Sequence, residues 1–321
     1  MKVLYNIFRK NFLNVEKTAR GELRRERIGE RKMPKYHIIS NPVAGKTKSA
    51  KKLAIVERVF TERGVDFQTH LSTCEGDATK IARELTEKGE KEIIALGGDG
   101  TLHEVLNGLA DPQNCRLGLI PAGTGNDFAE KVGLSLNAEV ASHFILDNQP
   151  KATDYLEVGG VRCMNVAGVG MDVDVLERCK RGKRTGKLKY LFSLLQSLFS
   201  FKGCDVEIVS DGIREKRSVL IGATCNGGQF GGGIPICPVA DVSDGKLDVV
   251  VVDCIGGKWK IIKAFLKLMK GKILEYPATK HFLCERVQFL PKKPCAMQLD
   301  GEIYKDMAFD ATLKKGLQFY R

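Results

Sequence analysis

Residues 93–108, with the sequence IIALGGDGTLHEVLNG, decide the fold. The first four residues are apolar and predict a short buried strand of a parallel sheet. The glycines that follow allow a tight turn and the close approach of a ligand to the backbone. Thr101 then has the position of a helix N-cap, and Glu104 three residues later would complete a capping box. The stretch therefore predicts a strand, a glycine turn and a helix in direct succession.

This succession predicts an anion site, because free N–H groups and the positive end of the helix dipole point at one place. Phosphate is the expected ligand. Asp99 lies among the glycines, where a lone carboxylate would repel phosphate, so it indicates a bound Mg²⁺ or an accepted proton or hydrogen bond. The alternative is a plain strand–turn–helix connection of an α/β domain, which the motif alone leaves open.

Two further loops follow predicted strands. The loop at residues 40–46 comes after the strand at 36–39 and before a helix; it fails the P-loop spacing because Ser40 stands where glycine is required. The loop at residues 122–128 comes after the strand at 117–121. Strands and helices that alternate in this way predict a doubly wound parallel sheet, and the three loops should meet at its carboxyl edge.

Composition limits the class of protein. The chain has 321 residues, 43% hydrophobic and 28% charged, as expected of a soluble globular protein with two domains. No apolar run is long enough to span a bilayer. The ten cysteines form no C-x-x-C pair, which favours reduced thiols and a cytoplasmic location.

The net charge of +12 is concentrated at the start of the chain, because residues 1–35 carry +7. Bulk charge therefore gives little support to nucleic-acid binding. Residues 1–35 have three interpretations: a basic amphipathic helix for an anionic membrane, a disordered arm, or the product of an upstream start codon. We favour the last two, and predict that the first domain proper begins at residue 36.

From residue 153 the pattern becomes mostly β, with strands expected at 154–158, 206–209 and 247–252, and hairpin turns at Gly159-Gly160 and Asp211-Gly212. We predict domains at 36–152 and 153–321, and the last strand could return to the first domain. Two apolar helices, at 188–201 and 258–272, are too short to span; each could contact a membrane or pack on the sheet. On the second we expect an apolar face and a lysine face. The apolar face holds Trp259, Ile262, Phe265, Leu266 and Met269, and the opposite face holds Lys260, Lys263, Lys267 and Lys270.

Four motifs in order resemble the diacylglycerol kinase catalytic family, most closely its soluble bacterial lipid kinases of the diacylglycerol or sphingosine kinase type. The motifs are GGDGT at 97–101, GTGNDF at 123–128, NVAGVGMD at 165–172 and DGKLD at 244–248. The resemblance runs from residue 36 to residue 321. It implies a nucleotide-binding α/β domain, a β-sandwich domain and an active site in the cleft between them.

The resemblance also implies ATP and Mg²⁺. The residues expected at ATP are Asn41, Pro42, Val43, Ala44, Gly45, Thr73, Gly97, Gly98, Asp99, Gly100, Thr101, Leu102 and Thr124. A metal site is implied at Asp241, Asp244 and Lys246, where Lys246 would contribute its carbonyl oxygen. Asp127, Asp154 and Asp244 match acidic positions that order water and metal nearby, and Asp99 would be the electrostatic centre of phosphoryl transfer.

The sequence LDGE at 299–302 matches the motif from which the family draws its general base. A lipid hydroxyl can be deprotonated by a carboxylate within hydrogen-bond reach. Both Asp300 and Glu302 are candidates, and the sequence does not separate them. A hairpin turn is the other interpretation of Asp300-Gly301, and the resemblance weighs against it. His103 stands where the family often has asparagine; we expect it to face solvent and to have a structural role.

The prediction is a lipid kinase that phosphorylates the hydroxyl of diacylglycerol or a related lipid. It would meet its substrate transiently at the inner face of a membrane, without nucleic acid, and homodimerisation is left open. The alternatives are an NAD kinase, which has a related GGDG motif, and a non-enzymatic lipid- or nucleotide-binding protein. The acidic residues and the GTGND loop favour a lipid kinase over both alternatives.

Overall fold

The computed structural model describes residues 35–42, 44, 48–181, 193, 196, 197, 200–254 and 256–321. Residues Lys35–Arg321 form one compact unit. The predictions made for residues 1–34, for most of the helix at 188–201, and for Val43 and Gly45 lie outside the described residues. The domain boundary at 152 and 153 stays a prediction.

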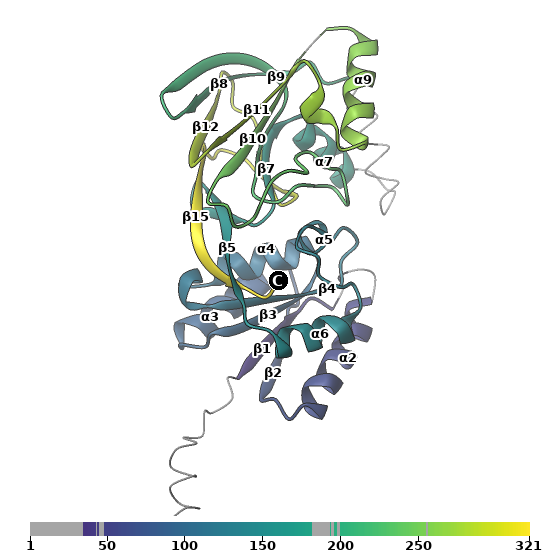
Figure 1. Ribbon diagram of the computed structural model, residues 1–321, viewed down its shortest axis with the longest axis vertical. Helices are drawn as coiled ribbons and strands as arrows, with labels where there is room; N and C mark the ends of the chain where they lie inside the picture. The colour runs from purple at the N-terminus through teal and green to yellow at the C-terminus, as the bar shows by residue number, and fades with distance from the viewer. Residues whose placement is uncertain are drawn as a thin grey trace, which may run out of the picture. The chain divides into compact units, whose positions relative to one another are not determined.

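The first part of the unit is a parallel sheet with strands in the order β2-β1-β3-β4. Its strands are β1 (Tyr36–Ser40), β2 (Phe67–Leu71), β3 (Glu92–Gly97) and β4 (Arg116–Pro121). Helices α2 (Lys48–Glu62) and α6 (Ala138–Asp147) share a core on one face of the sheet. Helices α3 (Asp77–Glu87) and α4 (Asp99–Gly108) cover the other face (Figure 1). The predicted doubly wound sheet is confirmed.

Helix α4 begins at Asp99, and its N-cap is Gly98, three residues before the expected cap Thr101, without a side-chain hydrogen bond. The predicted capping box is therefore wrong. Thr101 packs on the backbone of Gly97, where an added methyl group would lie 2.2 Å from the Thr101 hydroxyl. The Glu104 carboxylate accepts a hydrogen bond from the N–H of Ala78 in α3 instead (3.2 Å). The glycines of the turn allow the helix to begin before Thr101. The first N–H groups of the helix therefore have no side-chain cap and are available to a ligand.

The second part is the predicted β-sandwich-like domain. Its strands are β5 (Lys151–Val158), β6 (Val161–Cys163), β7 (Val166–Gly170), β8 (Cys204–Ser210), β9 (Ile213–Cys225), β10 (Leu247–Asp253), β11 (Thr279–Cys284), β12 (Arg286–Pro291), β13 (Met297–Leu299), β14 (Glu302–Tyr304) and β15 (Phe309–Phe319). One core lies among these strands, and a second lies between them and helices α7 (Met171–Arg181) and α9 (Lys258–Met269). The hairpins expected at Gly159-Gly160 and Asp211-Gly212 join β5 to β6 and β8 to β9.

Strand β15 belongs to both sheets. It pairs antiparallel with β12 and β5, shifts register between Lys314 and Leu317, and then pairs parallel with β4 through Gln318 and Phe319. Figure 1 shows it as the long yellow strand that reaches the α/β sheet. Phe319 is fully buried and packs edge-to-face on Phe128, with ring centroids 5.3 Å apart. The end of the chain thus completes the core of the first sheet.

Among the described residues, no helix is long and apolar enough to cross a bilayer.

Candidate active site

A cavity of about 600 Å³ opens at the carboxyl edge of the parallel sheet, and we call it the sheet-edge cavity. The loops that follow β1, β2, β3 and β4 all contribute to its wall, as the sheet topology predicts. Its lining residues are Asn41, Pro42, Ala44, Leu71, Ser72, Thr73, Cys74, Glu75, Gly98, Asp99, Gly100, Thr101, Glu104, Gly123, Thr124 and Glu302. Nine of the residues expected at ATP are among them. Gly97 and the core residue Leu102 are not, and Val43 and Gly45 are not described.

The loops after β3 and β4 touch each other through glycines. A methyl group on Gly123 would lie 2.5 Å from the Cα of Gly98, so neither position has room for a side chain. Asn126 holds the second loop in shape: its Oδ1 accepts from the N–H of Gly123 (2.8 Å), and its Nδ2 donates to the carbonyl of the same residue (3.1 Å). This contact brings the uncapped N-terminus of α4 next to Thr124.

Asp99 joins this loop to the start of α5 (Asp127–Lys131). Its carboxylate accepts from the backbone N–H groups of Asn126 (2.8 Å) and Phe128 (3.2 Å). It therefore caps α5, whose own N-cap residue makes no such bond. Burial raises the pKa of Asp99 in spite of these bonds. The same residue also lines a second cavity on its other side.

We call this second space the acidic cavity; it has a volume of about 160 Å³. Its wall is formed by Asp99, Gly125, Asp127, Asn165, Val166, Asp172, Leu176, Phe230, Gly231, Gly232, Gln298, Asp300 and Gly301. Five buried polar atoms in it make no hydrogen bond of good geometry in the described part of the chain, although the Gln298 amide faces the Asp172 carboxylate. They are Oδ1 of Asp127, Oδ1 of Asn165, both carboxylate oxygens of Asp172 and Nε2 of Gln298. Buried polar atoms without partners are costly, so the cavity is suited to a polar ligand or to water.

The pKa values of two carboxyl groups in the acidic cavity are raised toward neutral pH. Burial, followed by the charge of Asp99, raises the pKa of Asp127 to about 6, although its Oδ2 accepts from the N–H of Gly232 (2.9 Å). Burial raises the pKa of Asp172 to about 6 as well. Both groups can therefore gain or lose a proton within the physiological range.

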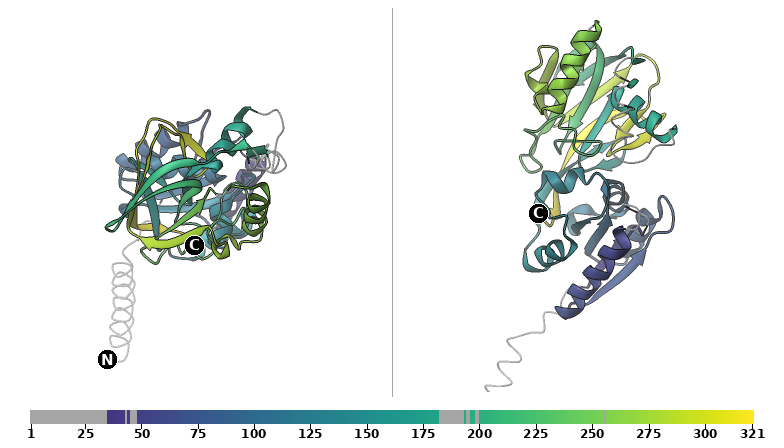
Figure 2. Two further views of the ribbon diagram at one scale, coloured as in Figure 1. Left: turned by 90° about the horizontal axis from the view of Figure 1, so that it is seen from above. Right: turned by 90° about the vertical axis from the view of Figure 1, so that its right-hand side faces the viewer.

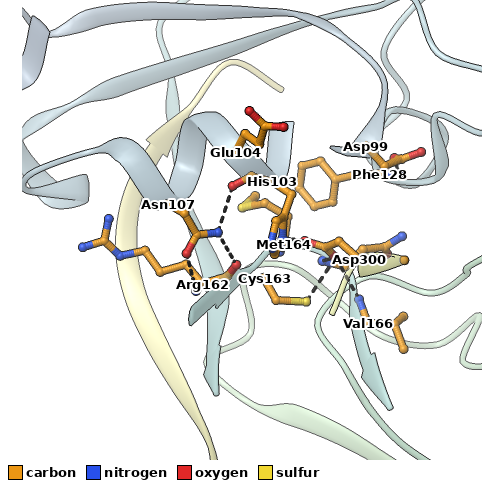
Figure 3. Close-up of polar contacts among 12 residues, drawn as sticks. Asp99, His103, Glu104, Asn107, Phe128, Arg162, Cys163, Met164, Val166 and Asp300 are labelled. Carbon is orange, nitrogen blue, oxygen red and sulfur yellow. Dashed lines mark hydrogen bonds and ion pairs between the residues drawn. The ribbon is translucent and has the colours of Figure 1, made fainter. Parts of the chain in front are cut away.

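Asp300 has a different environment, shown in Figure 3. Its two oxygens accept hydrogen bonds from the backbone N–H groups of Met164 (2.8 Å), Asn165 (2.8 Å) and Val166 (3.3 Å), and from the thiol of Cys163 (3.1 Å). Burial alone would raise its pKa, but the bonds from His103 and the other donors hold that pKa below the usual range. A carboxylate with so many donors is a poor base.

His103 completes the environment of Asp300, and the expectation that it faces solvent is wrong. Only 4% of its surface is exposed. Its Nδ1 lies 3.2 Å from Oδ2 of Asp300, and its Nε2 lies 2.8 Å from the hydroxyl of Tyr304. A carboxylate can only accept, so Nδ1 of His103 donates to Asp300. The residue links α4 to the β13–β14 hairpin, which agrees with a structural role.

Glu302 lies on the other side of the same hairpin. Asp300 and Gly301 form its two-residue turn with positive φ angles of 51° and 91°, so the hairpin interpretation that the resemblance weighed against is correct. The turn directs the two carboxylates to different places. Glu302 is half-buried at the sheet-edge cavity, and its Oε1 lies 3.8 Å from a methyl group placed on Gly100. It therefore stands opposite the N-terminus of α4.

The residues expected to hold a metal lie outside both cavities, in the exposed loop before β10. Oδ1 of Asp241 accepts from the N–H (2.9 Å) and hydroxyl (2.8 Å) of Ser243. Oδ1 of Asp244 accepts from the N–H of Lys246 (2.9 Å), and the N–H of Gly245 donates to Asp154 (2.8 Å).

These side chains do not form a cluster. Among the described residues, the group of three with metal-ligand spacing is Cys237, Asp248 and His281, which includes none of them. Carboxylate and carbonyl oxygens suit Mg²⁺, but the loop holds its carboxylates in turn bonds rather than around one point. Metal binding at Asp241, Asp244 and Lys246 stays a prediction.

Sequence reasoning did not single out Gln298, and it gave Asn165 and Asp172 no role. A signal for two of them was present, because Asn165 and Asp172 flank the buried strand β7 (Val166–Gly170). Polar residues at the ends of buried strands collect at sheet edges, where ligands bind. Gln298 lies in the middle of the short strand β13 and gives no comparable signal.

The chain matches known families along most of its length. Residues 35–158 match the model of the diacylglycerol kinase catalytic domain, and residues 165–315 match that of the YegS C-terminal NAD kinase beta sandwich-like domain. A diacylglycerol kinase of Bacillus subtilis (strain 168) is 30% identical over 276 residues, which cover 84% of this chain and 90% of that protein.

Two further matches agree. A protein of Xanthomonas campestris named probable lipid kinase YegS-like is 30% identical over 80% of this chain and 87% of its own length. A crystal structure of a diacylglycerol kinase from Bacillus anthracis str. Sterne superposes with a TM-score of 0.74 at 26% identity, and covers 91% of this chain and 98% of that one. These names favour a lipid kinase over an NAD kinase and over a non-enzymatic protein.

Proposed function

The chain belongs to the diacylglycerol kinase catalytic family and is a lipid kinase, and from this premise we propose its reaction. It transfers the γ-phosphate of ATP, with Mg²⁺, to the hydroxyl of diacylglycerol or a related lipid, which gives phosphatidic acid or its equivalent. The protein would work in the cytoplasm and visit the inner face of the membrane.

The observation that carries this proposal is that two cavities share one buried carboxylate, Asp99. The sheet-edge cavity has the features of a phosphate site: an uncapped helix start, glycines without room for side chains, and the hydroxyls of Thr101 and Thr124. The acidic cavity has unpartnered polar atoms beside the apolar residues Leu176 and Phe230, which suits the hydroxylated head of a lipid. Donor and acceptor would thus meet at Asp99.

We assign the general base to Glu302 and a positioning role to Asp300. Glu302 is half-buried in the wall of the sheet-edge cavity and directly follows Gly301, which lines the acidic cavity. Asp300 is instead buried among donors that lower its pKa. In the reaction, Glu302 accepts the proton of the lipid hydroxyl as its oxygen bonds to the γ-phosphorus. The bond between that phosphorus and the bridging oxygen breaks, and ADP leaves. Bound Mg²⁺ supplies charge neutralisation at the phosphates.

The test is the variant Glu302→Gln, which keeps the shape of the side chain and removes the base. With radiolabelled ATP and diacylglycerol in detergent micelles, kcat should fall at least about a hundredfold. The matched control is Glu285→Gln, an exposed glutamate whose carboxylate contacts Lys246 and Lys315, and it should keep its turnover.

The same assay is run against sphingosine and NAD to identify the acceptor, and with EDTA to test the metal. Normal turnover of Glu302→Gln would reject the base assignment. Label found in NAD but in no lipid would reject the proposed reaction.

A further inference from the structure

Helix α9 (Lys258–Met269) packs on the sheet with a face that is largely distinct from the predicted apolar face. Ala264 and Leu268 are buried, and Ile261 and Phe265 pack partly against the same core. Of the five residues expected on the apolar face, which was predicted either to contact a membrane or to pack on the sheet, Phe265 is the one that packs against this core. The reason is that the helix has apolar residues on two sides, and the sequence pattern alone does not say which side meets the sheet.

The outer face of α9 carries apolar residues that the fold leaves exposed. Trp259 is 79% exposed, Leu266 51% and Met269 42%. With Ile262, they recur at intervals of three and four residues and so form one stripe about 15 Å long. Just beyond the helix, Gly271 lies against Pro235 and Pro238, and Val239 beside them is 63% exposed. We call this set the α9 stripe. Figures 1 and 2 show α9 in light green at the outer surface of the β-rich part.

A row of lysines runs beside the stripe. Residues 258–272 contain six lysines and no acidic residue. Lys267 pairs with Glu275 (2.5 Å). Lys260, Lys263 and Lys270 are exposed, and they have no acidic partner among the residues that the structure describes. The surface is therefore apolar along one line and positively charged along the next.

We infer that the α9 stripe and its lysine row dock on an anionic lipid bilayer. An interfacial helix has this composition, with tryptophan at the headgroup level, aliphatic side chains below it and lysines against lipid phosphates. A second copy of the chain fits less well, because a symmetric contact through this face would bring the two lysine rows together. The inference deepens the proposed function, since it supplies the means by which a lipid kinase reaches a substrate held in a membrane.

Trp259 provides the test, because it is the one tryptophan of the chain. The unlabelled protein is mixed with two kinds of phosphatidylcholine vesicles. One kind contains about 30% phosphatidylglycerol and presents an anionic surface, and the other contains none. We expect a blue shift of the tryptophan emission with the anionic vesicles, quenching by brominated lipids, and a weaker effect at high salt. An unchanged Trp259 spectrum while the protein sediments with vesicles would place the contact elsewhere and overturn the inference.

Two matched triple variants separate charge at this face from charge in general. Lys260, Lys263 and Lys270 replaced by Glu should lower vesicle binding at least about tenfold. Lys216, Lys292 and Lys293, also exposed, are replaced by Glu as the control and should lower it much less. Equal losses in the two variants would overturn the inference.

A second readout, kinase activity on a soluble lipid, separates failure of the docking inference from failure of the proposed reaction. The α9 variant should phosphorylate a short-chain, water-soluble diacylglycerol at the normal rate. If neither the wild type nor the variant phosphorylates it while the wild type still binds vesicles, the proposed reaction fails and the docking surface stands. A tryptophan shift that depends on protein concentration without vesicles, or on added nucleic acid, would identify a different partner and overturn the inference.

Discussion

Replacing Asp300 by asparagine should destabilise the fold more than any single change at the surface of the site. The carboxylate accepts from three backbone N–H groups, one thiol and His103. The amide of asparagine keeps one oxygen. If that oxygen takes the place of Oδ1, it still serves Cys163, Asn165 and Val166. The amide NH₂ then faces the N–H of Met164 and Nδ1 of His103, and both donors lose their acceptor.

The magnitude follows from these contacts. Each of these two buried donors costs about 1–3 kcal/mol when it has no partner, so we expect a loss of about 3–5 kcal/mol in the free energy of unfolding. For a protein of this size that corresponds to a fall in Tm of roughly 5–7 °C. Because the pKa of Asp300 is held low, its stabilising effect is present above the unfolded pKa and is lost as pH falls through the folded one. The difference between wild type and variant should therefore shrink below about pH 4.

The assay is thermal and denaturant unfolding of wild type, Asp300→Asn and Glu302→Gln at pH 7 and at acidic pH. Glu302→Gln is the control, because its side chain is half-buried at a cavity and its loss should move Tm by less than about 2 °C. A variant Asp300→Asn that melts within about 2 °C of wild type would refute the assignment of Asp300 as the residue that positions the hairpin.

Three further predictions concern charges at and near the site. Asp172→Asn should raise Tm above pH 6, because ionisation of the buried Asp172 carboxyl destabilises the folded wild type. The difference in Tm between variant and wild type should grow between about pH 4 and 6 and be absent below pH 4, as measured by thermal melts across pH. Turnover should fall as pH is lowered through about 6, where Asp127 gains a proton, and a flat pH–rate profile there would exclude a role for its charge. Asp244→Ala should weaken the response of activity to added Mg²⁺; an unchanged Mg²⁺ titration would remove the metal assignment from its loop.

Local sequence patterns predicted the frame of the site well. The apolar run of β3 and the glycines after it are enough to place a loop at the carboxyl edge, since parallel strands must end there. The predicted start of α4 was three residues too late, because threonine is a residue type that often caps helices. Its hydroxyl instead packs on Gly97, a contact between residues of the turn and helix that composition does not reveal.

Long-range contacts account for the other differences. Asp300 and Glu302 are equally good candidates for the general base when only the sequence is known. The pairing of β13 with β7 and β14 places one carboxylate in the interior and the other at a cavity. His103 is 197 residues from Asp300 along the chain, so its burial depends on an element that local patterns do not include. The outward side of α9 was likewise undetermined, because which of its two apolar sides packs depends on the sheet beneath it.

Strand β15 has a consequence for the order of events during synthesis. Its last residues pair with β4 and bury Phe319 in the core of the first sheet, so that sheet has an open edge until the ribosome has made residues 318 and 319. The first sheet therefore completes its fold only about two hundred residues after its own four strands have been made. A chain stalled before residue 317 should remain sensitive to protease in its first half. A stop codon placed there should destabilise the first sheet as a disruptive substitution in β4 would.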